Sequence, residues 1–187
     1  SYNKLGRVAD GEILCFLQDD DIPPDSMKWI ENALALFHSH PQLGMLGGLT
    51  GWNLYSPSKE LYGLEYSGRV FYDIPYSCPY TNQSFMYVSA LNLGPIFVRR
   101  STFYELGQFS IDFSCRGSPG MYFETELSLR MWEFGWQVGL YDTGDFRHHV
   151  TGPKDRKILK RSASAQQYRA GRSFNGLMNR KLVRTLY

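Results

Sequence analysis

The sequence predicts an α/β domain in which helices flank a mixed, mostly parallel sheet. Short apolar runs bounded by turn residues alternate along the chain with longer segments of helical periodicity. This alternation is typical of strand–helix–strand units. With 187 residues, 43% of them hydrophobic and 16% aromatic, the chain is large enough for one domain with a substantial core. No apolar run approaches the roughly 20 residues that span a bilayer.

The first predicted strand is residues 12–18, a short apolar run that leads directly into three aspartates. A helix is expected within residues 23–41, with Asp25 or Ser26 as its N-cap and Pro41 at its end. Its buried face is expected to consist of four apolar residues at helical spacing, which are Met27, Ile30, Leu34 and Phe37.

The rest of the body predicts further strands and helices. Residues 53–84 are rich in Tyr, Ser, Pro and Gly and predict a long irregular loop or hairpin. The second of the later helices should end at Gly135 and bury Phe123, Leu127, Met131 and Phe134. Strands are expected at 43–52, where glycines allow close backbone approach, and at 85–91, 94–100 and 137–142; helices are expected at 101–107 and 122–136.

Three consecutive aspartates, Asp19, Asp20 and Asp21, follow the first predicted strand. Like charges at the end of a buried strand repel, so a positive group is expected among them. Ligands of open α/β sheets gather at the carboxyl ends of strands, and grouped carboxylates suit Mg²⁺ or Mn²⁺. The alternative is a solvated acidic turn that caps the next helix.

Four segments together resemble family 2 glycosyltransferases, which have a GT-A fold. NKLGRVADGEILCFLQDDDIPP resembles the middle of that family, with an Asn–Gly lead-in, Ala-x-Gly-Glu, an apolar strand and a DxD motif. GPIFVRRSTFYELGQFSIDF is similar to its acceptor-side segment, and YFETELSLRMWEFGWQV is similar to its acidic helix. RHH at 147–149 is similar to the family's late histidine. The resemblance covers residues 1–149.

The resemblance implies an inverting transfer of a sugar from a UDP-, GDP- or dTDP-sugar to a hydroxyl of a glycan or lipid-linked acceptor. Mn²⁺ or Mg²⁺ would be held by Asp19, Asp20, Asp21 and His148. Glu124 would be the catalytic base, and the helix N-terminus is expected to keep it ionised. Donor or acceptor contacts are assigned to six further residues, which are Asn3, Arg7, Gln18, Arg100, Glu126 and His149.

Three departures from the family pattern accompany this resemblance. The family begins with a nucleotide-binding strand and helix that precede Asn3, so roughly 70 to 90 residues of the complete fold are expected before this segment. The first acid of the metal motif aligns with Gln18, which leaves the ligand pair as Asp20 with Asp21 or Asp19. The family's catalytic Asp falls on Glu124.

Other interpretations of these residues stay open. Glu124 and Glu126 could be ordinary first-turn carboxylates that favour the helix dipole, and Glu126 could hold either a sugar hydroxyl or Arg130. His148 and its neighbour could be hydrogen-bonded surface residues, and Arg100 could pack against nearby acids. The rival enzyme class is a metal-dependent phosphohydrolase. The rival non-enzyme class is a catalytically incomplete sugar- or nucleotide-binding domain.

Charge divides the chain into a catalytic region, residues 1–153, and a basic helical tail, residues 154–187. The tail holds 10 Lys/Arg and one Asp, a net +9, whereas the body holds 10 Lys/Arg and 17 Asp/Glu, a net −7. The tail is either a solvated helix that packs on the body or a peripheral contact with an anionic membrane or phosphorylated ligand. Nucleic acid is not an expected partner. The three cysteines show no metal-ligand spacing and leave the compartment open.

Overall fold

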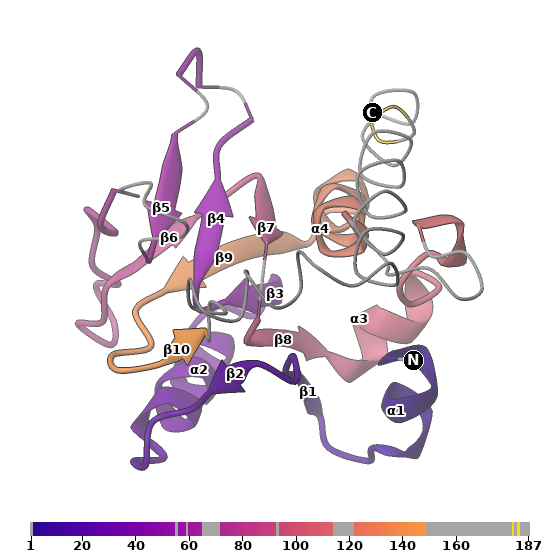
Figure 1. Ribbon diagram of the computed structural model, residues 1–187, viewed down its shortest axis with the longest axis horizontal. Coiled ribbons are helices and arrows are strands. Elements are labelled where there is room, and N and C mark those ends of the chain that lie inside the picture. Colours follow the sequence, from indigo (N-terminus) through magenta and orange to yellow (C-terminus); the bar gives the residue numbers. More distant parts are fainter. Residues whose placement is uncertain are drawn as a thin grey trace, which may run out of the picture.

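The computed structural model describes residues 2–54, 56–58, 60–64, 72–92, 94–113 and 122–148, together with 181 and 183. A five-stranded sheet forms its centre, with α2 (Lys28–Ser39) on one face. The other face packs against α1 (Tyr2–Val8), α3 (Arg100–Glu105) and α4 (Phe123–Glu133) (Figure 1). The prediction of an α/β domain is confirmed. The predicted basic tail lies outside the described residues, except for residues 181 and 183.

The central sheet is mostly antiparallel, so the prediction of a mostly parallel sheet is wrong. Only β3 and β9 pair in parallel, whereas the other three neighbouring pairs are antiparallel. The strand order is β1 (Ile13–Phe16), β8 (Ile96–Arg99), β3 (Leu43–Gly47), β9 (Gln137–Tyr141) and β6 (Phe85–Tyr87).

The direction of β8 explains this difference. Strands β1, β3 and β9 all run in the same direction, as expected of strand–helix–strand units, but β8 runs against them and lies between β1 and β3. Before β8, the chain reverses through a separate three-stranded sheet of β5 (Leu61–Gly63), β4 (Thr50–Trp52) and β7 (Ala90–Asn92). The pattern of strands and helices does not reveal such a reversal, because it carries no information on which strands become neighbours.

Residues 43–52 form two strands in two sheets, not the single predicted strand. The chain changes sheets at glycines, where the predicted close approach is confirmed. A Cβ on Gly48 would lie 2.3 Å from Cγ2 of Thr143 and 2.8 Å from Cγ of Pro95. The predicted irregular segment that follows includes β5, and residues 85–91 likewise divide between β6 and β7.

Helix α2 buries a different set of residues from the predicted one. Met27 and Leu34 are 58% and 47% exposed, so their assignment to the buried face is wrong. Trp29 was not predicted to be buried. Because it is buried, the face of α2 that packs on the sheet is rotated relative to the predicted face. Met27 occupies the N-cap without a side-chain hydrogen bond, whereas the hydroxyl of the predicted Ser26 accepts a hydrogen bond of 3.3 Å from the backbone N–H of Lys28, the first residue of the helix. The buried residues are Trp29, Ala33, Leu36 and Phe37.

Helices α3 and α4 end as predicted at glycines with positive φ, because Gly107 (+83°) and Gly135 (+80°) adopt the left-handed conformation. Leu127 and Met131 are fully buried on α4. Phe134 is 63% exposed, which makes its predicted burial wrong. The helix has already ended before this residue, so the helical spacing no longer points it at the core.

Two short elements beside the main sheet position the candidate site. Strand β2 (Asp21–Ile22) pairs antiparallel with β10 (Arg147–His148), and neither strand was expected from the sequence. The helix α1 and the 3₁₀ turn η1 (Ile111–Phe113) were also not expected. Within the described part of the chain, no helix is long and apolar enough to cross a membrane.

Candidate active site

The pairing of β2 with β10 brings His148 to the aspartates. His148 lies opposite Asp21 in the register. Its Nδ1 is 2.9 Å from Oδ1 of Asp21, and its Nε2 is 3.3 Å from Oδ2 of Asp20. The imidazole therefore bridges two carboxylates across 127 residues of sequence.

Asp20 and Asp21 have different environments. The side chain of Asp21 is fully buried, and its Oδ2 accepts a hydrogen bond of 2.8 Å from the backbone N–H of Gln18. Gly94 lies against the same oxygen, since a Cβ there would come within 2.5 Å of it. Asp20 is 44% exposed at its side chain. Asp21 is thus held in place by the fold, whereas Asp20 can reach a ligand from solvent.

His148 offsets the repulsion between the consecutive aspartates. The hydrogen bond to Asp21 raises the pKa of His148 above its ordinary value, and the charges of the aspartates act in the same direction while burial opposes them. A protonated imidazole between two carboxylates is the positive group that the repulsion requires.

One ligand atom from each of Asp20, Asp21 and His148 lies within 4.8 Å of the others. Two carboxylates and an imidazole form a donor set that fits Mn²⁺ better than Mg²⁺, because Mg²⁺ prefers oxygen ligands alone. Asp19 lies on an exposed turn and is not part of this group, although it was predicted as a ligand.

Glu124 lies in the first turn of α4, and the residue is only 5% exposed. Burial raises the pKa of its carboxyl to about 7, and a hydrogen bond from its own backbone N–H offsets only part of that rise. The expectation that the helix N-terminus keeps this group ionised is therefore wrong in direction, because desolvation outweighs the helix dipole. A carboxyl with a pKa near neutrality is suited to proton transfer.

The ring of Tyr2 packs between Phe16, on the strand that precedes the aspartates, and Phe123, on the helix that carries Glu124. The ring centroids of Phe16, Phe109 and Phe123 lie 5.6, 5.9 and 5.7 Å from that of Tyr2. Burial raises the pKa of its phenol to about 12, and the charges of Glu124 and of all three aspartates add to the rise. The phenol thus lies within the electrostatic range of both carboxylate groups. The sequence showed no signal for this role, because an apolar environment is ordinary for a tyrosine.

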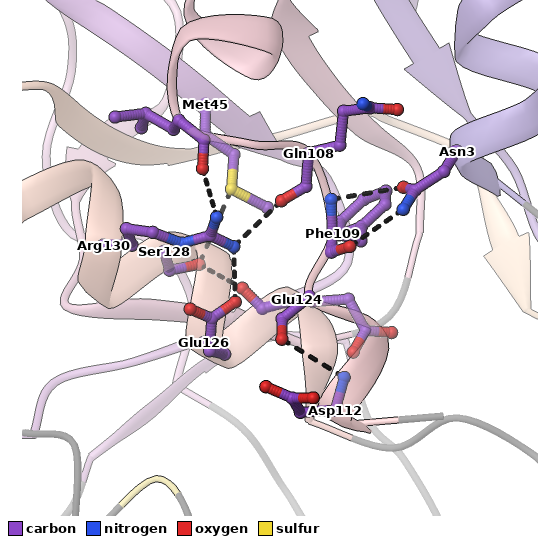
Figure 2. A network of polar contacts seen from close by, with 11 residues as sticks. Asn3, Met45, Gln108, Phe109, Asp112, Glu124, Glu126, Ser128 and Arg130 are labelled. Carbon is purple, nitrogen blue, oxygen red and sulfur yellow. Dashed lines mark hydrogen bonds and ion pairs between the residues drawn. The ribbon is translucent and has the colours of Figure 1, made fainter. Parts of the chain in front are cut away.

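Glu126 belongs to a network of polar contacts (Figure 2). Its Oε2 lies 2.5 Å from Nη2 of Arg130, and the same guanidinium donates to the carbonyl oxygens of Leu106 and of Gln108, the latter at 2.9 Å. Of the two partners considered for Glu126, the structure therefore shows Arg130. This network joins α4 to the segment that follows α3.

Asn3 holds the same segment from the other side. Its side-chain amide donates to the carbonyl of Phe109 at 2.8 Å and accepts from the N–H of Phe109 at 3.2 Å, as Figure 2 shows. Both ends of the amide are used in this contact. Asn3, predicted to bind donor or acceptor, thus positions the backbone beside Glu124 and Tyr2.

Replacing Asn3 by alanine should lower the free energy of unfolding by about 1–3 kcal/mol, because the half-buried N–H and carbonyl of Phe109 lose their partner. Chemical denaturation followed by tryptophan fluorescence measures this loss. Lys4→Ala, at an exposed position of the same helix, is the control and should change stability little. An equal effect of both variants would contradict this role.

Among the described residues, neither Arg7 nor Arg100 forms an ion pair with the aspartates or with Glu124. Arg7 is exposed in the last turn of α1. The guanidinium of Arg100 lies over the ring of Tyr104, 5.6 Å from its centroid, rather than against an acid. Gln18 contributes its backbone N–H to Asp21. His149 lies outside the described residues.

The chain was compared with protein-family models and with curated proteins. No protein-family model matches the chain, and no curated protein matches it.

Proposed function

We propose that this chain contributes active-site residues to an inverting glycosyltransferase that uses a nucleotide sugar. The observation that supports it most is the group of Asp20, Asp21 and His148, which unites two segments far apart in sequence. The resemblance assigns the segment that contains Asp20 and Asp21 to the donor diphosphate. It assigns the segment that contains His148 to the late histidine of the family.

A divalent cation would bind to Asp20, Asp21 and His148, with Asp20 as the most accessible ligand. When bound, the cation would supply positive charge that stabilises the diphosphate leaving group. The hydrogen bond between Asp21 and His148 fixes the orientation of the imidazole in this structure.

Glu124 is the proposed general base. Its pKa of about 7 leaves much of it deprotonated at neutral pH while it remains basic enough to accept a proton. The acceptor oxygen forms a bond to the anomeric carbon, its proton passes to the carboxylate of Glu124, and the bond from that carbon to the diphosphate oxygen breaks. Attack opposite the leaving group inverts the configuration.

The proposal is tested by incubating the protein with radiolabelled UDP- and GDP-sugars, Mn²⁺ and a panel of glycan and lipid-linked acceptors. We expect sugar transfer that requires an acceptor and stops in EDTA, with an inverted anomeric configuration in the product. Equal breakdown of the nucleotide sugar without any acceptor would instead indicate a phosphohydrolase. Binding without turnover under every condition would favour a binding domain.

Affinity for Mn²⁺ should fall as the pH is lowered, because a proton on His148 competes with the cation for the same nitrogen. The raised pKa of His148 places this competition above the ordinary range of histidine. Below that pKa, the affinity should fall by about tenfold for each pH unit. Calorimetric titration with MnCl₂ between pH 6 and 8.5 measures the slope, and a flat profile would remove His148 from the ligand set.

A further inference from the structure

The hydroxyl of Tyr2 binds to the backbone just before the aspartates. It donates a hydrogen bond of 3.3 Å to the carbonyl oxygen of Leu17, across 15 positions of sequence. Burial raises the pKa of this phenol to about 12, so the group is protonated at neutral pH and can act as a donor. Helix α1 is thereby connected to the segment that follows β1.

The peptide group that accepts this bond also donates to Asp21. The carbonyl of Leu17 and the N–H of Gln18 belong to one planar peptide unit. That N–H donates to Oδ2 of Asp21 at 2.8 Å, and Oδ1 of the same carboxylate lies 2.9 Å from Nδ1 of His148. A single hydrogen-bonded series therefore runs from Tyr2 through the peptide and Asp21 to His148, and each of its bonds polarises the next.

Residues 18–21 form a closed turn that includes this peptide. The N–H of Asp21 donates to the carbonyl oxygen of Gln18 at 3.2 Å, in addition to the bond between the N–H of Gln18 and the carboxylate. Asp20 lies within the turn, and its Oδ2 is 3.3 Å from Nε2 of His148. A displacement of the peptide would therefore move both carboxylates relative to the imidazole.

The ring of Tyr2 is held by contacts that do not involve its hydroxyl. It packs on Phe16, Phe109 and Phe123, and its plane is tilted by 80° to that of Phe16. Phenylalanine has the same ring and can keep these contacts. The contribution of the hydroxyl can therefore be separated from that of the packing.

We propose that Tyr2 is a positioning residue for the metal ligands. Its hydroxyl holds the peptide between Leu17 and Gln18, and this peptide holds the turn that presents Asp20 and Asp21 to a divalent cation. The inference rests on the cation site of the proposed function, but it does not depend on sugar transfer. Outer partners that orient ligands before binding raise affinity, because less ordering is needed when the cation binds.

Tyr2→Phe should weaken Mn²⁺ binding by about threefold to tenfold, the effect of losing one neutral hydrogen bond. Calorimetric titration with MnCl₂ at a fixed pH measures this change. Tyr104→Phe is the matched control, because its hydroxyl also donates to a backbone carbonyl, that of Gly6 in α1 at 2.7 Å. This control removes the same kind of bond from the same helix, and it should bind Mn²⁺ as the wild type does.

Amide hydrogen exchange measures the effect of Tyr2 on the turn without any metal. The N–H of Gln18 should exchange at least about threefold faster in Tyr2→Phe than in the wild type, because its bond to Asp21 is weakened. Tyr104→Phe should leave this exchange rate near that of the wild type. Equal acceleration in both variants would reflect a general loss of stability and would overturn the proposal.

The outcomes distinguish this inference from the proposed function. Equal Mn²⁺ affinity in Tyr2→Phe and the wild type would overturn the inference, and so would an equal loss in Tyr2→Phe and Tyr104→Phe. Mn²⁺ binding that depends on Tyr2, in a protein that transfers no sugar, would support the inference and contradict the proposed function. Absence of Mn²⁺ binding by the wild-type protein would overturn both.

Discussion

Replacing Glu124 by glutamine should lower kcat for sugar transfer by about 10²–10⁴, the effect of losing a positioned general base. Glutamine has nearly the same shape but cannot accept the proton of the acceptor hydroxyl. Binding of the nucleotide sugar and of Mn²⁺ should be unchanged, because Glu124 is not among the grouped ligand residues. Initial rates at saturating donor and acceptor provide the measurement.

Glu133→Gln is the matched control, since it changes an exposed glutamate at the other end of the same helix. It should leave kcat unchanged. Glu126→Gln should act mainly on stability, because Glu126 pairs with Arg130. Wild-type kcat in Glu124→Gln, in a protein that shows transfer, would remove Glu124 from the mechanism.

The free energy of unfolding should fall as the pH rises from about 4.5 to about 7, and Glu124→Gln should remove much of that fall. Burial raises the pKa of Glu124 from 4.5 in its ordinary state to about 7 in the folded state. The folded protein therefore binds more protons than the unfolded chain in this interval, so stability decreases with pH. A shift of this size corresponds to about 3 kcal/mol.

Denaturant unfolding of both proteins at several pH values provides the measurement. The two should differ little near pH 4.5, and Glu124→Gln should be the more stable by about 3 kcal/mol at pH 8. The raised pKa of His148 also makes stability fall with rising pH, so only the difference between the proteins reports on Glu124. Parallel curves for the two proteins would show that the carboxyl is not buried in solution.

Local features of this fold could be predicted from sequence wherever the signal lay in adjacent residues. The apolar run before the aspartates forms β1, and glycines end α3 and α4. The position of Glu124 in the first turn of a helix also followed from its neighbours.

Features that depend on distant pairing could not be predicted in the same way. The β2–β10 ladder contains two residues on each side, too few to produce a periodic pattern, yet it brings His148 to Asp21. The insertion of β8 between β1 and β3 depends on how the chain reverses elsewhere. Burial of Glu124 depends on residues from other elements, so its raised pKa required the folded structure.

Calorimetric binding of UDP and GDP, each with and without Mn²⁺, tests the central claim most directly. We expect at least one of the two to bind only when Mn²⁺ is present, and we expect Asp20→Ala to abolish that binding. Asp25→Ala, at an exposed position after the acidic run, should bind as the wild type does. Affinity that is unchanged in EDTA, or equal in Asp20→Ala and Asp25→Ala, would contradict a nucleotide site built on Asp20, Asp21 and His148.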